Sequence, residues 1–244
     1  MSTIKQRMID TFRLCIICLY FATQWVCAQQ TITFAVPNFP PYSYQQNKQV
    51  TGEGITLAEQ AFAKAKITPN YILLPNYAKV VYQVKENRAD GFLLASQNKE
   101  RDKIAVFSKP LLINRWSWYV LKDSVLTPKQ PNFKSQAIVS SHFNSNTHKW
   151  LASKGYKVQA AMRLNKLPKM LLTKRVDAVF ISERVFKQAV IDEGLNIDLF
   201  EQYAEIAKPF GIYISKHYLK LYPDTLTKLN NAIDQLSIDS DKIK

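Results

Sequence analysis

The residues in this chain that are best suited to binding or chemistry are an arginine and a serine near the end of an apolar run. Residues 88–96 read RADGFLLAS and continue into the polar stretch QNKERD, so Ser96 ends the run and Arg101 follows it. A guanidinium stays charged and presents a planar fork of donors that matches a carboxylate. These residue types allow anion binding by Arg101, with Ser96 close by, but do not by themselves favour it. The alternative is that Arg101 belongs to a solvated charged run and that Ser96 is an ordinary loop hydroxyl.

A second stretch has the same pattern. Residues 175–183 read RVDAVFISE, again with Arg, one apolar residue, Asp, a small residue and an apolar run that ends on a serine, Ser182. Each copy reads as a helix that ends in Arg, a tight corner at Asp and a buried strand. Chance similarity over nine residues is common, but each copy lies within its own series of strands and helices. We therefore expect two similar lobes.

Catalytic chemistry would need further side chains. His142, His148 and His217 could supply acid–base chemistry, but their positions show no spacing typical of metal ligands. Nothing near Ser96 in the sequence indicates a base that would activate it. We predict no catalytic residue, no metal and no cofactor, and keep an enzyme as the less favoured alternative.

The elements that would position these residues alternate along the chain. Apolar and β-branched runs predict strands, and helical spacing predicts helices between them. A polar break containing Pro128 and Pro131 separates two such series. Alternation of this kind predicts an α/β fold with mostly parallel sheets covered by helices, and a cleft near the carboxyl ends of the strands. The expected strands are 31–36, 70–74, 91–95, 116–121, 136–140, 178–182 and 209–215, and the main helices are 55–67, 77–88, 146–155 and 223–238.

The N-terminus reads as a secretory signal peptide. Lys5 and Arg7 precede the apolar run LCIICLYFATQWV, which is short for a membrane span, and VCA before residue 29 predicts cleavage after Ala28. Lipidation at Cys27 and an uncleaved anchor are the alternatives. All three cysteines lie in this segment. The remaining chain therefore has no thiol and must be stabilised by its core alone.

The chain is strongly basic, with a formal net charge of +14. Such a charge suits nucleic acid, an anionic membrane surface or anionic ligands. The lysines are spread along the sequence, however, and no nucleic-acid-binding motif is present. We interpret the charge as a solvated lysine-rich surface, and export argues against a nucleic-acid partner.

Several stretches together resemble the family 3 periplasmic solute-binding proteins, the polar amino-acid binders of bacterial ABC importers. They are PNFPPYSY (37–44), VTGEGITLAEQAFAKA (50–65), KERDKIAVFSKPLL (99–112) and KMLLTKRVDAVFISE (169–183). The resemblance implies a type II periplasmic binding fold, in which two lobes joined by two crossing strands close on one ligand. Residues 1–28 would be the signal peptide, 29–113 plus 211–244 lobe 1, and 114–210 lobe 2. It also implies a periplasmic monomer that serves an inner-membrane ABC permease or a sensor.

The resemblance also implies a ligand site. Arg101 would clamp a ligand carboxylate, and Ser96 would touch the same group. Residues at a polar turn before a lobe-2 helix would add backbone amides, which suit an anion, although simple helix capping is the alternative. Two aromatic residues would hold the ligand side chain, unless they belong to the core. The remaining predicted site residues are Ser145, Asn146, Phe39, Tyr77 and Ser182, with Tyr42, Tyr44 and Trp116 as weaker candidates.

Three positions depart from the family pattern. The family places an acid, which holds the ligand's ammonium group, where this chain has Ser182, and another acid where it has Val36. The glycine of the lobe-2 turn is replaced near Asn144. Glu183 is an alternative partner for an ammonium, although its side chain is expected to point elsewhere. The predicted ligand is thus a small polar solute, either an amino acid or a related carboxylate such as an organic acid.

Overall fold

The structure, a computed structural model, describes the backbone of residues 30–240 and the side chains of residues 31–236. The predicted signal peptide and the predicted cleavage after Ala28 lie outside the described residues. The features below belong to one compact unit, Thr31–Lys244. Within the described part of the chain, no helix is both long and apolar enough to cross a membrane.

Strands and helices alternate, as the sequence predicts. The first half contains β1 (Gln30–Pro37), β2 (Tyr44–Gln46), β3 (Gln49–Thr51), α2 (Glu53–Ala65), β4 (Ile67–Leu74), α3 (Tyr77–Lys85), β5 (Gly91–Ser96) and α4 (Lys99–Ile104). The long strand β6 (Ala105–Leu121) leads to α5 (Phe133–Gln136), β7 (Ile138–Ser140), α6 (Asn146–Ser153), β8 (Lys157–Val158), α7 (Lys166–Leu172), β9 (Ala178–Ser182), α8 (Glu183–Asp192) and the 3₁₀ turn η1 (Ile197–Leu199). A second long strand, β10 (Phe200–Ser215), returns to α9 (Lys216–Leu221) and α10 (Thr225–Ser240).

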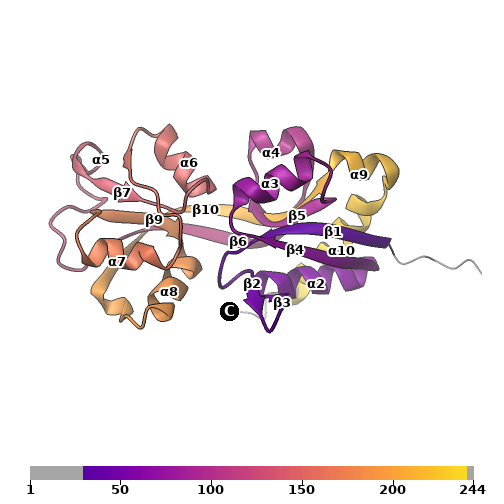
Figure 1. The fold of residues 1–244 in the computed structure, drawn as a ribbon, viewed down its shortest axis with the longest axis horizontal. Helices are drawn as coiled ribbons and strands as arrows, with labels where there is room; N and C mark the ends of the chain where they lie inside the picture. Colours follow the sequence, from indigo (N-terminus) through magenta and orange to yellow (C-terminus); the bar gives the residue numbers. More distant parts are fainter. Residues whose placement is uncertain (1–29, 241–244) are drawn as a thin grey trace, which may run out of the picture. The chain divides into compact units, whose positions relative to one another are not determined.

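The main sheet is continuous through both halves. Its strand order is β4-β1-β5-β10-β6-β9-β7-β8, with β1 parallel to β5 and β7 parallel to both β8 and β9. The two long strands β6 and β10 pair antiparallel from Phe200↔Leu121 to Ser215↔Ala105 and run side by side from one half to the other (Figure 1). They are the two crossing strands, and the predicted boundaries at residues 113 and 210 fall inside them.

The sequence located these crossing strands only in part. The apolar run at 116–121 predicted a strand, but β6 begins at Ala105. Pro110 and the polar residues Asn114 and Arg115 interrupt the apolar pattern before Trp116. Backbone pairing with β10, which the local pattern does not encode, extends the strand through them.

The repeated RADG and RVDA corners adopt the same backbone arrangement in the two halves. The amide of Asp90 donates to the Thr33 carbonyl at 2.8 Å, and its carboxylate accepts from the Thr33 amide at 2.9 Å. The amide of Asp177 donates to the Ile138 carbonyl at 2.8 Å, and its carboxylate accepts from the Ile138 amide at 2.7 Å. Each aspartate thus ties the start of its strand to a neighbouring strand. The repeat therefore marks equivalent corners in the two halves of the chain, as the sequence predicted.

The strands that carry the site are fully buried. Every residue of β5, GFLLAS, is inaccessible to solvent or nearly so. A side chain at Gly91 would lie 2.4 Å from the Tyr213 carbonyl oxygen, so the close approach of β10 requires glycine there. The second half has its own aromatic cluster, which includes Trp118, Phe133 and Phe180. β9 contributes Phe180 to this cluster, whereas β5 lies in the larger core cluster.

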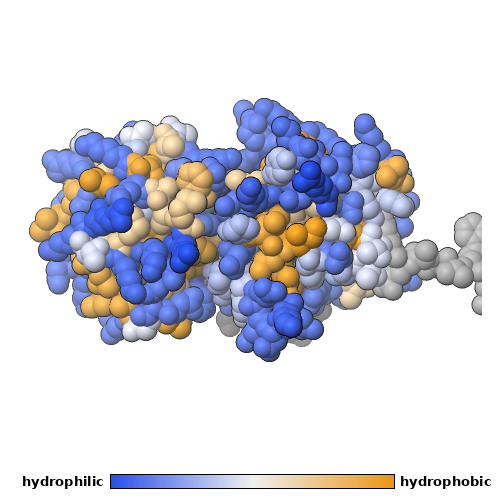
Figure 2. Space-filling view, viewed as in Figure 1, coloured by the Kyte–Doolittle hydropathy of each residue, from blue (hydrophilic) through white to orange (hydrophobic). Residues whose placement is uncertain are grey.

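The visible face of the molecule is mixed in hydropathy (Figure 2). Figure 2 shows hydrophilic residues over most of the visible face, with hydrophobic patches between them. Within the described residues, no cluster of three or more histidine, cysteine, aspartate or glutamate side chains is placed to hold a metal ion.

Candidate functional site

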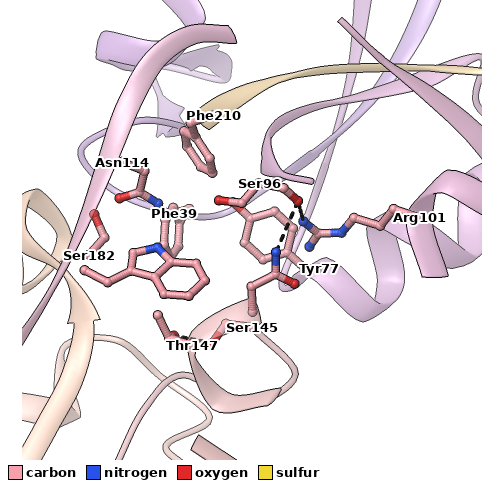
Figure 3. A pocket seen from close by; sticks show the side chains of 11 residues that line it. Phe39, Tyr77, Ser96, Arg101, Asn114, Ser145, Thr147, Ser182 and Phe210 are labelled. Atoms are coloured by element: carbon pink, nitrogen blue, oxygen red, sulfur yellow. Dashed lines mark hydrogen bonds between the residues drawn. The ribbon is translucent and has the colours of Figure 1, made fainter. Parts of the chain in front are cut away.

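A small cavity lies where the strand ends of the two halves meet (Figure 3). The space that the centre of a water molecule can occupy in it is about 20 Å³. This is room for only about one or two waters. All seven residues that the sequence predicted for the site line it. The lining residues are Phe39, Tyr77, Ser96, Arg101, Asn114, Trp116, Ser145, Asn146, Thr147, Ser182 and Phe210.

Arg101 is a buried cation. Its side chain is only 4% exposed, and its Nη1 donates to the Ser96 carbonyl at 2.6 Å. Its guanidinium lies 4.9 Å from the centre of the Tyr77 ring. No ion pair among the described residues includes it, and burial lowers the pKa of Arg101 from its ordinary value. An arginine still stays charged at neutral pH, so the cavity holds a positive charge without a carboxylate partner.

A hydrogen-bond network fixes the helix that carries Arg101. Asn98 caps α4, because its Oδ1 accepts from the Arg101 amide at 2.9 Å. The Tyr213 hydroxyl donates to Asp102 Oδ1 at 2.8 Å and accepts from the Asn98 amide at 3.2 Å. Burial, together with the bond to Asp102, raises the pKa of Tyr213, so its hydroxyl stays protonated. Tyr213, on β10, thus holds both ends of this short segment.

Asn146 bridges to the first half of the chain. Its Nδ2 donates to the Ser96 carbonyl at 3.1 Å, and its Oδ1 accepts from Asn98 Nδ2 at 2.8 Å. The Ser96 carbonyl therefore receives both Arg101 and Asn146. The sequence pointed to the hydroxyl of Ser96, whereas the bonds to these two residues run through its backbone oxygen.

Ser145 is a helix cap. Its Oγ accepts from the His148 amide at 3.2 Å and lies 2.7 Å from the His142 carbonyl, to which it donates. Thr147, one of the lining residues, forms a hydroxyl pair with Ser145 at 2.8 Å. The capping role expected as the alternative is thus present, and the same turn borders the cavity.

The predicted aromatic pair lies in the cavity wall with other rings. Phe39 meets Tyr77 edge to face at 5.5 Å between ring centres and lies 6.5 Å from Phe210. The Tyr77 hydroxyl donates to the Leu94 carbonyl, and burial raises the pKa of Tyr77. One face of the Tyr77 ring is occupied by Arg101. This leaves less room than the sequence suggested for a flat or cationic ligand group between Phe39 and Tyr77.

The positions that depart from the family pattern carry no acid in the cavity. Ser182 lines it and lies 3.4 Å from the Tyr42 hydroxyl, while Val36 is completely buried. The carboxylate of Glu183 bonds to Lys187 at 2.7 Å, and Glu183 is not a lining residue. Its side chain therefore does point elsewhere, as expected.

Three lining residues were missed from the sequence: Asn114, Thr147 and Phe210. Asn114 precedes Trp116 by two positions on β6, so the two share a face of the strand. The weaker candidate Trp116 was thus the available signal for Asn114. Tyr42 contacts the site through Ser182, whereas Tyr44 is not a lining residue.

The histidines lie outside the cavity lining. His142 is buried behind it with its ring centre 6.5 Å from that of Phe39, and burial lowers the pKa of His142 to about 4. His148 accepts from the Asn144 amide through Nδ1 at 3.2 Å. His217 lies on α9. None of the three is placed beside Ser96 as a base.

Comparison with known proteins gives a consistent result. A family model described as bacterial extracellular solute-binding proteins, family 3, matches residues 32–243. A probable histidine-binding protein of Campylobacter jejuni is 24% identical over 218 residues, covering 87% of this chain and 82% of that protein.

Solved structures share the fold at low sequence identity. A histidine kinase sensor domain with similarity to periplasmic binding proteins has a TM-score of 0.75 at 17% identity, covering 87% of this chain and 93% of that one. The GluR0 ligand-binding core from Nostoc punctiforme with L-glutamate scores 0.71 at 18% identity, with 86% and 94% covered. A mutant of the arginine-bound ArgBP from T. maritima scores 0.70 at 17% identity, with 86% and 97% covered. The predicted type II periplasmic binding fold is confirmed.

Proposed function

Because this chain belongs to the bacterial extracellular solute-binding proteins, family 3, we propose that the cavity around Arg101 is where it captures its solute. The solute would be a small carboxylate, with an amino acid or a related acid as the class. The observation that carries this proposal is the buried Arg101 guanidinium, which has no carboxylate partner among the described residues.

A carboxylate ligand completes the electrostatics of the cavity. The side chain of an arginine has five N–H donors. In Arg101, Nη1 is the one side-chain nitrogen that donates to an acceptor among the described residues. A buried charge without a partner costs several kcal/mol, so a bidentate carboxylate would relieve this cost. Asn146 and the α6 turn would add amide donors from the other half. Phe39, Tyr77 and Ser182 would enclose the remainder of the solute.

Capture would involve opening of the two halves. A volume for one or two waters is too small for an amino acid, and contacts already join the two halves. They include Asn98 with Asn146 and Glu53 with Arg184. Rotation about β6 and β10 would admit the solute, as in hinge closure. We propose residues 29–113 plus 211–244 as lobe 1 and 114–210 as lobe 2.

The family also supports a proposal for the partner and the compartment. We propose a periplasmic monomer, released from its signal peptide, that delivers the solute to an inner-membrane ABC permease. The Campylobacter relative, a probable histidine-binding protein, supports an amino acid or a related acid as the solute. The likeness to a histidine kinase sensor domain supports the second candidate, a sensing role. A non-catalytic role is supported by the family, whose model describes solute-binding proteins.

A thermal-shift screen tests the capture proposal. The full exported chain is mixed with amino acids and small organic acids, and hits are measured by calorimetry. Binding should raise the melting temperature by mass action. Arg101→Ala should abolish the shift, and Arg101→Lys should weaken it, because lysine keeps the charge without the planar fork.

The matched control is Arg88→Ala, which removes an exposed arginine stacked near Tyr82. It should bind the hits as the wild type does. No shift with any carboxylate, or equal shifts in Arg101→Ala and Arg88→Ala, would contradict the proposal. Pull-down of a permease or of a kinase by the ligand-bound protein separates import from sensing.

A further inference from the structure

The cavity carries a single charge. Of its eleven lining residues, only Arg101 is ionised at neutral pH, since the buried Tyr77 has a raised pKa. The acid nearest in sequence to the end of β9, Glu183, is paired with Lys187. A monoanionic solute would therefore leave the site neutral. A zwitterionic solute would leave it with a net charge of about one.

Asn114 lies at the opposite side of the cavity from that charge. Its side chain is only 3% exposed, and its Oδ1 has no hydrogen-bond partner among the described residues. On β6 it shares a face with Trp116, and Trp116 pairs with Ser182 across the β6–β9 ladder. Figure 3 shows Asn114 and Ser182 on one side of the cavity and Arg101 on the other, with aromatic rings between them.

The chemistry of Asn114 and Ser182 suits a neutral group. An amide offers one acceptor and two donors, and a half-turn of its end exchanges them with little change in shape. A ligand hydroxyl both donates and accepts, so it can pair with Asn114 in either orientation and with Ser182. An ammonium only donates, and it would meet neutral oxygens without a counter-charge in a buried place.

We infer that the preferred solute is a small monoanionic carboxylate that presents a hydroxyl, rather than an ammonium, to Asn114 and Ser182. This inference rests on the proposed function, in which Arg101 holds the carboxylate. It assigns to Asn114 the discrimination between hydroxy acids and amino acids. Asn114 thereby becomes a specificity-determining residue on one of the crossing strands.

Matched pairs of solutes test this inference directly. Calorimetry on the full exported chain, unfolded and refolded to remove retained solute, would compare lactate with alanine and phenyllactate with phenylalanine. In each pair a hydroxyl replaces the ammonium at nearly constant shape. We expect the hydroxy acid to bind about tenfold or more tightly than its amino acid in every pair that binds.

Two substitutions locate the preference. Asn114→Asp adds the missing carboxylate and should reverse the order of each pair in favour of the amino acid. Asn114→Leu should weaken the hydroxy acid by about tenfold while keeping Arg101-dependent binding. The matched control is Asn70→Asp, the same change at an exposed residue of β4, which should preserve the wild-type order. Circular dichroism confirms that each variant folds.

The outcomes separate the two proposals. Tighter binding of the amino acids by the wild type would overturn this inference and leave the proposed function standing. An unchanged order in Asn114→Asp would also overturn it. Failure of every carboxylate in both classes to bind would overturn the proposed function and, with it, this inference.

Discussion

Removal of the Tyr213 hydroxyl, which does not line the cavity, should still weaken solute binding. Tyr213 is completely buried on β10, and its hydroxyl joins Asp102 and the Asn98 amide, the two ends of the segment that carries Arg101. Tyr213→Phe deletes these two bonds and keeps the ring, which stacks on Phe92 at 4.5 Å between ring centres. The change therefore tests hydrogen bonding separately from packing.

The magnitude follows from the two lost bonds. At about 1 kcal/mol for each intramolecular hydrogen bond, the free energy of unfolding should fall by about 2 kcal/mol. α4 would lose its anchor, so Arg101 would spend less time in the geometry that clamps a carboxylate. We expect the dissociation constant of a captured solute to rise by about three- to tenfold, which corresponds to about 1 kcal/mol.

Urea denaturation gives the free energy of unfolding, and calorimetry gives the dissociation constant. Tyr71→Phe is the matched control, because the buried Tyr71 hydroxyl has no hydrogen-bond partner among the described residues. Its removal should leave both quantities unchanged or raise stability slightly. A Tyr213→Phe protein that loses stability but keeps the wild-type dissociation constant would refute the positioning role. Equal effects of Tyr213→Phe and Tyr71→Phe would refute the hydrogen-bond reasoning itself.

Three further perturbations test other parts of the structure. Burial lowers the pKa of His142 to about 4, so between about pH 6.5 and pH 4 only the unfolded chain gains its proton. The free energy of unfolding should therefore fall as pH falls through this window, and His142→Phe should remove up to about 3 kcal/mol of that fall. Urea denaturation at several pH values measures this, and an unchanged dependence of the free energy of unfolding on pH in His142→Phe would contradict it. Glu53 and Arg184 are both about half exposed, so a double-mutant cycle should give a coupling below about 1 kcal/mol. Gly91→Ala should lower the free energy of unfolding by about 1–3 kcal/mol, because the added carbon would meet the Tyr213 carbonyl oxygen. Urea denaturation measures this loss, and an unchanged free energy of unfolding would mean that β10 can move away.

The sequence predicted those parts of the fold that depend on short-range pattern. The buried run of β5, the helical spacing of α2 and the two Asp corners are all encoded within a few residues. The long pairing of β6 with β10 is not, because it joins residues about 80 or more positions apart and passes through Pro110 and Asn114. Only the resemblance to a family pointed to two crossing strands.

The same distinction applies to the site. Arg101 and Ser96 could be recognised because the end of β5 and the start of the next helix, α4, lie only a few residues apart in the sequence. Phe210 could not, since it reaches the cavity from β10, opposite Ser96 in the sheet. For Asn114 the available signal was indirect, namely the weaker candidate Trp116 two positions later. A polar residue before WSWYV reads as a loop until the pairing of β6 turns it toward the cavity.

Contacts across the cavity also limit how ligand affinity should be interpreted. Asn146 bonds to the Ser96 carbonyl and to Asn98, so the protein itself supplies part of the contact between the halves. A solute shifts the balance between open and closed states only by its differential affinity for the two. Contacts that the protein makes by itself in the closed state therefore add to closure but give no discrimination between solutes. Discrimination must come from polar atoms that lack a protein partner when the halves meet. Among the described residues, these include the Arg101 donors other than Nη1 and the Asn114 Oδ1, at the two sides of the cavity.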